Sequence, residues 1–168
     1  MLEDISIYDE RRKESFLPVL HRLNEQINQL QSNNKLIKEH FYQTFHQSGI
    51  GMAILELDGS FREVNECLSE IFGYTRAEME GGMCFQDLSD ISSLRNDSEK
   101  LLDLANGKIG SYKTYKKCYT KAGEKIPTII NMSLIRNNDG EPLYFVSQVI
   151  PVNTIANLAE YFEHSGKL

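Results

Sequence analysis

Large apolar residues return at alternating intervals of three and four positions between residues 20 and 41, in a stretch otherwise rich in Gln, Asn, Lys and Glu. This spacing gathers them on one narrow face of an α-helix, and it is typical of a coiled coil. An amphipathic helix packed on its own domain would carry a similar stripe. We expect a parallel homodimer through this heptad lane, whose members are Leu20, Leu23, Ile27, Leu30, Asn34, Ile37 and Phe41.

Two residues suggest where this helix begins. Ser15 can cap a helix, and Pro18 suits a first turn, where the N–H that proline lacks would have no helical partner. The expected dimerisation helix therefore spans residues 15–46 and follows a flexible start over residues 1–14. Asn34 is the polar member of the lane, and in a parallel pair it would bond to its own copy and fix the register.

After Gly49 the apolar period shortens to two, which indicates β-strands. Residues 51–65 are expected to form two strands joined at Asp58-Gly59, a dipeptide that suits a tight hairpin turn. Residues 65–106 show several short helical segments, and glycines separate them. One hairpin followed by short helices therefore opens the domain.

Three further strands are expected within residues 109–120, 125–135 and 143–150. The order predicts an α+β domain over residues 47–152, a five-stranded antiparallel sheet with short helices on one face. Residues 153–168 carry a second apolar stripe, which predicts a C-terminal output helix and tail. The buried faces of the last two strands are expected to hold Ile126, Thr128, Ile130, Met132 and Leu134 on one strand and Leu143, Phe145, Ser147 and Val149 on the other.

Two blocks of the sequence resemble the PAS domain family. They are VNECLSEIFGYTRAEMEGG, residues 64–82, and KAGEKIPTIINMSLIRNNDGEPLYFVSQV, residues 121–149. The resemblance implies a sheet of strand order 2-1-5-4-3, a long N-terminal helix, and Asn65 as the cap of the first short helix. It also implies a sensory role in signal transduction, with a downstream effector domain or protein as partner.

Two prolines depart from the pattern of that family. Many members end the last strand with Asp-Ile-Thr, whereas this chain has Pro151, Val152 and Asn153. Proline has no N–H and a fixed φ, so the coupling between the sheet and an output helix is expected to differ at this exit. Pro127 predicts an edge position or a bulged start for the fourth strand.

The resemblance also raises the question of a cofactor at Cys84. The light-sensing branch of the family bonds a cysteine to flavin, but here Met83 stands where that branch has an asparagine, and Val149 where it has a glutamine. We therefore expect Cys84 to be a packing residue. Haem-binding members need an axial ligand in the core, and every histidine of this chain lies outside residues 47–152. No cofactor is predicted.

The inward faces of sheet and helices would enclose a small pocket. The lysines of YKTYKKCY, residues 112–119, alternate with tyrosines and are expected to face solvent, so no site for a small anion is predicted. The possible ligand is therefore apolar, a metabolite or a fatty acid. The expected lining residues are Phe85, Leu104, Ile130, Met132, Phe145 and Val149.

Composition narrows the function classes. With 18 basic and 24 acidic residues the formal net charge is -6, and no basic cluster suggests nucleic acid as a partner. No apolar run reaches the roughly 20 residues of a membrane span, and the first residues lack a signal-peptide pattern, which indicates a cytoplasmic protein. The 3 cysteines have no CxxC spacing, so neither disulfides nor a metal site is predicted. No catalytic motif is present, and we expect no enzymatic activity.

These expectations combine into a PAS-like sensory module that acts through homodimerisation and protein–protein interaction. It would be the regulatory part of a bacterial sensor of the diguanylate cyclase or histidine kinase type. The alternative is a small-molecule sensor that binds an apolar ligand in its pocket. A small molecule bound to protein purified from its host would favour the alternative.

Overall fold

The computed structural model describes the backbone of residues 2–89 and 94–153, and the side chains of residues 16–89 and 99–153. The chain divides into two compact units, Met1–Gln43 and Thr44–Leu168, and each is described by itself. The expected output helix over residues 153–168 lies outside the described residues from position 154 onward. Within the described ranges, no helix has both the length and the apolar character needed to span a bilayer.

The N-terminal helix α1 (Leu2–His46) begins earlier than expected. Residues 2–14, expected to be a flexible start, are helical, and Pro18 lies inside the helix instead of in its first turn. The segment 2–14 contains neither glycine nor proline, so nothing in it interrupts a helix. Pro18 removes one backbone hydrogen bond from α1, a local loss that the turns on either side tolerate here.

The second unit holds the expected five-stranded antiparallel sheet. Its strand order is β2-β1-β5-β4-β3, which confirms the predicted order 2-1-5-4-3. Pro127 is paired with Lys117 of β3 but lies just before the β4–β5 pairing, which starts at Thr128 and Pro151. The strands are β1 (Gly51–Leu55), β2 (Phe61–Val64), β3 (Ser111–Tyr119), β4 (Lys125–Arg136) and β5 (Pro142–Pro151).

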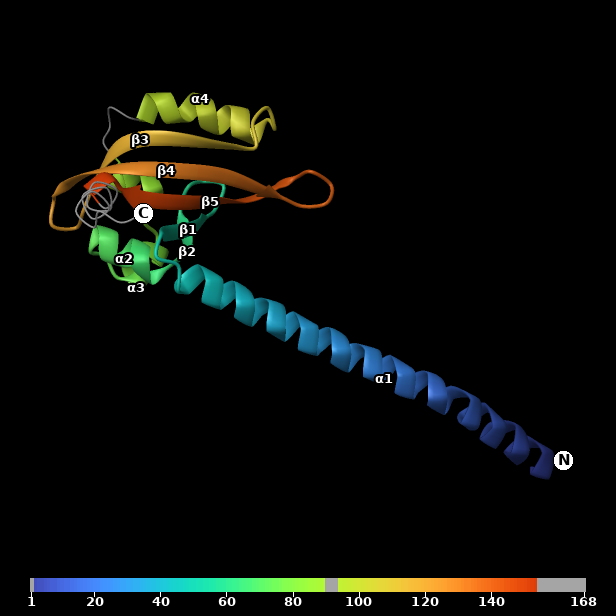
Figure 1. Ribbon diagram of the computed structural model, residues 1–168. Coiled ribbons are helices and arrows are strands. Elements are labelled where there is room, and N and C mark those ends of the chain that lie inside the picture. Colours follow the sequence, from blue (N-terminus) through green and yellow to red (C-terminus); the bar gives the residue numbers. More distant parts are fainter. Residues whose placement is uncertain (1, 90–93, 154–168) are drawn as a thin grey trace, which may run out of the picture. The chain divides into compact units, whose positions relative to one another are not determined.

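Short helices fill the sequence between β2 and β3. Figure 1 shows α4 lying along β3, with α2 and α3 near β1 and β2. Gly73 ends α2 with a φ of 74°, a left-handed conformation that favours glycine. Thr75 and Glu78 form a capping box at the start of α3. The helices are α2 (Glu66–Phe72), α3 (Arg76–Glu80), the 3-10 helix η1 (Phe85–Leu88) and α4 (Leu94–Ala105).

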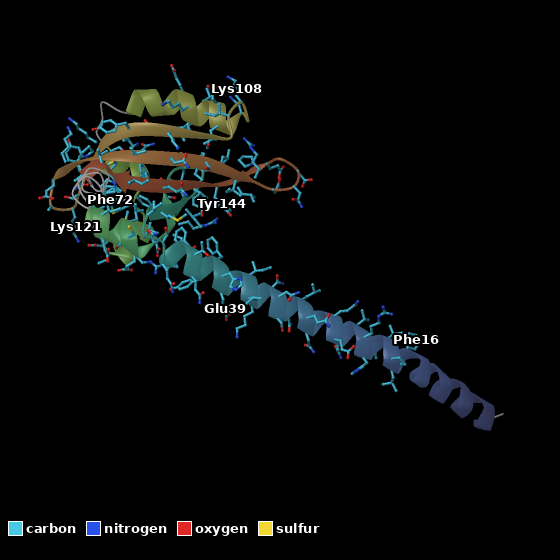
Figure 2. All side chains as sticks on the ribbon, in the orientation of Figure 1. Phe16, Glu39, Phe72, Lys108, Lys121 and Tyr144 are labelled. Atoms are coloured by element: carbon cyan, nitrogen blue, oxygen red, sulfur yellow. The ribbon has the colours of Figure 1, made fainter. Side chains whose placement is uncertain are left out.

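The core lies between the sheet and these helices. Alternate residues of β4 and β5 are buried as the period-two pattern predicted, whereas Leu143, at the start of β5, is 44% exposed. A side chain at Gly51 would meet Leu68 and Ile71 at 2.9 Å, so glycine allows α2 to pack closely on β1. Figure 2 shows Phe72 within this unit. The largest fully buried side chains include Leu55, Val64, Leu68, Phe72, Met79, Leu88, Leu104, Ile130 and Val149.

Asn65 links the beginning of the domain to α2. Its Oδ1 accepts hydrogen bonds from the backbone N–H of Met52 at 2.8 Å and of Leu68 at 2.9 Å. Its Nδ2 donates to the carbonyl oxygens of Phe45 at 3.0 Å and Ile50 at 2.8 Å. The side chain is fully buried. The predicted capping role is confirmed, and the same amide also holds two segments on either side of β1.

An ion pair joins α3 to the turn between β3 and β4. Lys121 Nζ donates to Glu78 Oε1 at 2.5 Å, and Thr75 donates to the other carboxylate oxygen. We expect the pKa of Glu78 to be about 2, below its ordinary value of 4.5, chiefly because of the Lys121 hydrogen bond. Any stability that ionised Glu78 contributes is therefore complete above about pH 4.5 and is lost as the pH falls toward about 2.

An NMR pH titration of the Glu78 carboxyl carbon measures this pKa. Lys121→Met should raise it toward 4.5, because the largest cause of the shift is removed. Lys113→Met, on the exposed face of β3, is the control and should leave it unchanged. An ordinary pKa in the parent protein would show that the ion pair does not persist in solution.

Candidate functional site

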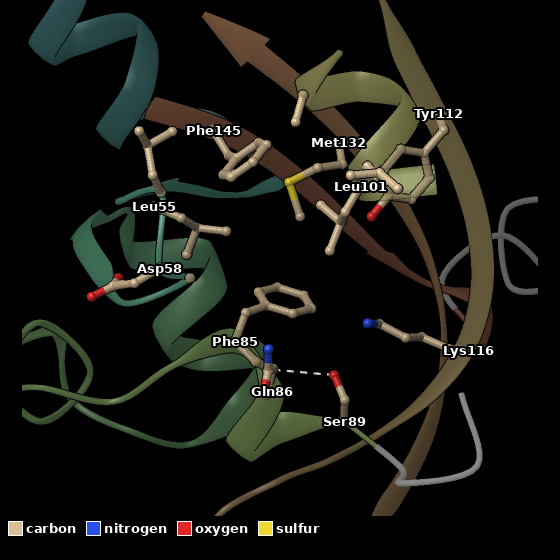
Figure 3. A pocket seen from close by; sticks show the side chains of 14 residues that line it. Leu55, Asp58, Phe85, Gln86, Ser89, Leu101, Tyr112, Lys116, Met132 and Phe145 are labelled. Atoms are coloured by element: carbon tan, nitrogen blue, oxygen red, sulfur yellow. Dashed lines mark hydrogen bonds between the residues drawn. The ribbon is translucent and has the colours of Figure 1, made fainter. Parts of the chain in front are cut away.

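A cavity of about 450 Å³ opens between the sheet, η1 and α4 (Figure 3). Its walls come from β1, from the turn that follows it, and from the inward faces of β3, β4 and β5. The volume falls in the range of roughly 300–1,000 Å³ that is usual for small-molecule pockets. The lining residues are Leu55, Leu57, Asp58, Gly59, Phe85, Gln86, Ser89, Leu101, Leu102, Ala105, Tyr112, Lys116, Met132 and Phe145.

Lys116 faces this cavity, contrary to the expectation that the β3 lysines all face solvent. In β3 the inward side chains are Tyr112, Thr114, Lys116 and Cys118, and Lys116 is only 8% exposed. Lys113 and Lys117 lie on the exposed face. Successive side chains of a strand point to opposite faces, so the adjacent Lys116 and Lys117 cannot both face solvent. The interior of the domain therefore holds a positive charge that the sequence analysis missed.

Phe85 and η1 form the wall opposite Lys116. The Lys116 Nζ lies 4.9 Å from the centroid of the Phe85 ring, and Figure 3 shows the lysine pointing toward it. The hydroxyl of Ser89 donates to the carbonyl oxygen of Phe85 at 3.1 Å, which steadies the last turn of η1. Ser89 also forms a bridge with Cys118 of β3, so the end of η1 is attached to the strand that carries Lys116.

Helix α4 closes the cavity on another side through Leu101, Leu102 and Ala105. Its C-terminal end is fixed to β4, because Arg136 Nη2 donates to the carbonyl oxygens of Leu104 at 2.9 Å and Ala105 at 2.6 Å. A cation at the C-terminal end of a helix satisfies carbonyls that lack partners and complements the helix dipole. Arg136 thus attaches the C-terminal end of this wall to β4.

Asp58 is the acidic residue of the lining, at the turn between β1 and β2. Its Oδ1 accepts from the Ser60 hydroxyl at 2.6 Å and from the Ser60 backbone N–H at 2.9 Å. These hydrogen bonds lower the pKa of Asp58, so the carboxylate is ionised at neutral pH. Figure 3 shows the carboxylate pointing away from the cavity. The Asp58 carboxylate therefore points away from the cavity, whereas the Lys116 side chain points into it.

Only part of the expected pocket lines the cavity. Phe85, Met132 and Phe145 do, whereas Leu104, Ile130 and Val149 are buried in the core and are not among the lining residues. Ser147, on the inward face of β5, is fully buried, and its hydroxyl has no hydrogen-bond partner among the described residues.

Cys84 is half-buried and is not among the residues that line the cavity. It precedes η1, pairs with Ser60 as an isolated bridge, and donates its backbone N–H to Asp87 Oδ2 at 2.7 Å. Cys118 is the buried cysteine, with its Sγ 3.4 Å from Thr128 Oγ1. Among the side chains that the structure describes, no group of His, Cys, Asp and Glu could hold a metal ion.

A family model described as "PAS domain" matches residues 49–150 of this chain. The match covers the sheet, the short helices and the cavity just described. The chain belongs to the PAS domain family. PAS domains are sensory rather than catalytic modules, so the family assigns a regulatory role to this part of the protein and no reaction.

Comparisons with individual proteins support the family and the fold. The chain is 32% identical over 116 residues to a probable diguanylate cyclase, DgcE, of Escherichia coli, a match that covers 69% of this chain but 10% of the cyclase. A PAS domain structure from Colwellia psychrerythraea is 12% identical with a TM-score of 0.62, covering 68% of this chain and 96% of that one. A domain of a sensor histidine kinase/response regulator from Geobacter sulfurreducens is 17% identical with a TM-score of 0.54, covering 67% and 91%.

Proposed function

We propose that this PAS domain is the regulatory part of a bacterial sensor of the diguanylate cyclase or histidine kinase type, and that it acts as a parallel homodimer joined through α1. The observation that carries the proposal is the exposure of the heptad lane in the single chain. Its apolar members are between 48% and 64% exposed, namely Leu20, Leu23, Ile27, Leu30, Ile37 and Phe41.

A helix of this kind needs a partner. An isolated helix gains little from its own hydrogen bonds, and most helical stability in proteins comes from packing an apolar face. The opposite face of α1 is polar apart from Leu36 and includes the ion pairs His21–Glu25 at 3.4 Å and Lys35–Glu39 at 3.8 Å, which suit a surface that stays in water. A second copy of the chain covers the apolar lane and leaves the polar face hydrated.

Asn34 favours a second copy over a different partner. It occupies an a position of the heptad lane, where two copies of the same residue face one another across the axis of a parallel pair. The two amides can then bond to each other, which fixes the register and limits the assembly to two chains. A self-pairing residue has no such partner in an unrelated helix.

We expect the parent protein to sediment as a single dimer, and Asn34→Ile to give higher oligomers or shifted registers together with a raised thermal midpoint. The apolar replacement removes the amide pair that restricts the assembly and increases buried apolar area. Analytical ultracentrifugation and thermal unfolding measure both effects. Asn33→Ile, outside the lane, is the control and should leave the mass unchanged. A parent monomer at tens of micromolar, about the range in which weak dimers form, would contradict the proposal.

A second candidate function is the sensing of a small molecule, and the cavity favours it. The cavity of about 450 Å³ is bounded mostly by leucine, methionine and aromatic side chains. Native mass spectrometry of the protein purified from its host, together with a visible absorption spectrum, tests this function directly. A bound mass that is lost on denaturation supports it, and the bare chain mass in repeated preparations counts against it.

A further inference from the structure

A buried hydroxyl beside the cavity indicates what the cavity would recognise in a ligand. Ser147, on the inward face of β5, is fully buried, and nowhere in the described part of the chain does its hydroxyl have a hydrogen-bond partner. We propose that Ser147 is a ligand-binding residue, which forms a hydrogen bond with a neutral molecule that carries one carbonyl or hydroxyl oxygen on an apolar frame. This inference rests on the ligand-sensing function proposed above and names the chemical class of the ligand.

Ser147 lies next to two side chains that line the cavity. In the strand register it is directly opposite Met132 of β4, and Phe145 is its neighbour on the inward face two residues earlier. Met132 and Phe145 both belong to the lining. On its other side Ser147 is opposite Ala53 of β1, whose side chain is a single buried methyl group. The register therefore places the hydroxyl within one residue of the cavity wall.

The hydroxyl of Ser147 is destabilising unless another molecule bonds to it. Burial removes its hydrogen bonds with water, and no described residue replaces them. Alanine would fill nearly the same space and would leave no polar group unsatisfied. Residues that break this rule of polar satisfaction are expected mainly at functional sites. A ligand oxygen that bonds to Ser147 removes the penalty, so the site favours such a ligand over a purely apolar one of the same shape.

The surroundings of the hydroxyl favour a neutral ligand group. The residues beside Ser147 in the sheet are Ala53, Met132, Phe145 and Val149, and all of them are apolar and buried. A charged group at this point would lose its hydration and gain no counter-charge from these neighbours. A carbonyl or hydroxyl oxygen loses less on leaving water, and one serine hydroxyl can satisfy it.

Met132 provides the route from the cavity to Ser147. Its side chain is unbranched and has three rotatable bonds, so it adapts to a ligand more readily than a branched side chain does. Figure 3 shows it projecting into the space that Phe85 and Phe145 also border. A change of its rotamer opens the wall directly opposite Ser147. The apolar frame of the ligand then packs against the two phenylalanine rings while its oxygen reaches the hydroxyl.

The test compares acetophenone with isopropylbenzene, two probes of similar shape of which only the first carries a carbonyl oxygen. NMR titration of the full chain, labelled at backbone amides and methionine methyl groups, should show that acetophenone shifts the Ser147 amide and the Met132 methyl signals. Ser147→Ala should weaken acetophenone by about fivefold or more, because the bound carbonyl loses its partner, and should leave isopropylbenzene within a factor of about two. Ser133→Ala, on the outward face of β4, is the matched control and should leave both probes unchanged.

Thermal unfolding without a probe distinguishes a ligand-binding hydroxyl from a structural one. Ser147→Ala should leave the thermal midpoint unchanged or raise it, because the substitution removes an unsatisfied polar group. A lowered midpoint with no effect on acetophenone binding would show that the hydroxyl bonds to a buried water as part of the fold. That result overturns the inference.

The remaining outcomes separate this inference from the function on which it rests. Binding of both probes in the cavity with no effect of Ser147→Ala overturns the inference but keeps the ligand-sensing function. Absence of binding by both probes overturns the inference and counts against ligand sensing as well. Should Ser147→Ala fail to fold, nuclear Overhauser effects between acetophenone and Ser147 in the parent protein decide: their presence supports the inference, and their absence overturns it.

Discussion

Replacing Asn65 with alanine is expected to lower the free energy of unfolding by about 3 to 5 kcal/mol. The substitution leaves the N–H groups of Met52 and Leu68 and the carbonyls of Phe45 and Ile50 without their side-chain partner. Each buried polar group left unsatisfied costs about 1–3 kcal/mol, and loss of a helix cap costs about 1 kcal/mol. Because water can reach some of these groups after the change, the total is expected to fall below the simple sum.

Urea denaturation followed by far-ultraviolet circular dichroism measures this loss. Asn137→Ala is the matched control, since Asn137 also makes several side-chain hydrogen bonds, to Asp139 and Glu141, but these are exposed to solvent. The control should cost no more than about 1 kcal/mol, because water replaces the lost partners. A loss below about 1 kcal/mol for Asn65→Ala would show that its hydrogen bonds do not hold the domain together.

Placing lysine at both Leu23 and Leu30 should convert the proposed dimer into a monomer. Both residues belong to the heptad lane, and in a parallel pair each would meet its own copy. Four ammonium groups would then lie along one apolar seam, next to groups of the same charge. We expect the dimer dissociation constant to rise by about a thousandfold or more, which corresponds to roughly 4 kcal/mol.

Sedimentation equilibrium over a range of concentrations measures the change. The double substitution Gln29→Lys and Ser32→Lys adds the same charge on the polar face of α1 and is the control. It should leave the dissociation constant within a factor of about three, since exposed charges contribute little. Persistence of the dimer in the Leu23 and Leu30 variant would place the interface elsewhere on the chain.

The elements of the domain could be predicted because local signals agree with the final fold. The glycines of the three β-turns, Gly59, Gly123 and Gly140, have φ angles of 89°, 80° and 84°, which is the conformation that their turn sequences predict. The start of α1 was placed too late because Ser15 and Pro18 resemble a helix start. Both residues can also lie inside a helix. Because residues 2–14 contain neither glycine nor proline, the helix continues through them toward the N-terminus.

The cavity was harder to predict than the sheet. A period of two assigns Ile130, Met132 and Val149 to the inner face, but it does not tell which inner residues border empty space and which are packed against neighbours. Only Met132 of these three lines the cavity. That distinction depends on where η1 and α4 lie over the sheet, which is a matter of tertiary packing.

Lys116 shows a different limit. Lysines lie mostly on protein surfaces, and this general tendency was applied to every lysine of β3. Successive side chains of a strand point to opposite faces, so the adjacent Lys116 and Lys117 cannot both face solvent. Lys116 lies two residues before Cys118, whose apolar side chain is buried, and residues two apart in a strand point to the same face. Lys116 should therefore have been assigned to the inner face of β3. The alternation of side chains along β3 thus places a lysine at the wall of the cavity.

The pairing of the first and last strands has a consequence for how such a domain can be exchanged between proteins. Gly51 at the start of β1 lies opposite Val149 near the end of β5, so the chain enters and leaves the sheet on adjacent strands, which are about 5 Å apart. A module whose two ends meet in this way can be inserted into a longer polypeptide, or removed from it, while the segments before and after it keep nearly the same spacing. Because β1 and β5 are neighbouring inner strands, a small change in their separation at this end of the sheet acts on the chain both where it enters the sheet and where it leaves it.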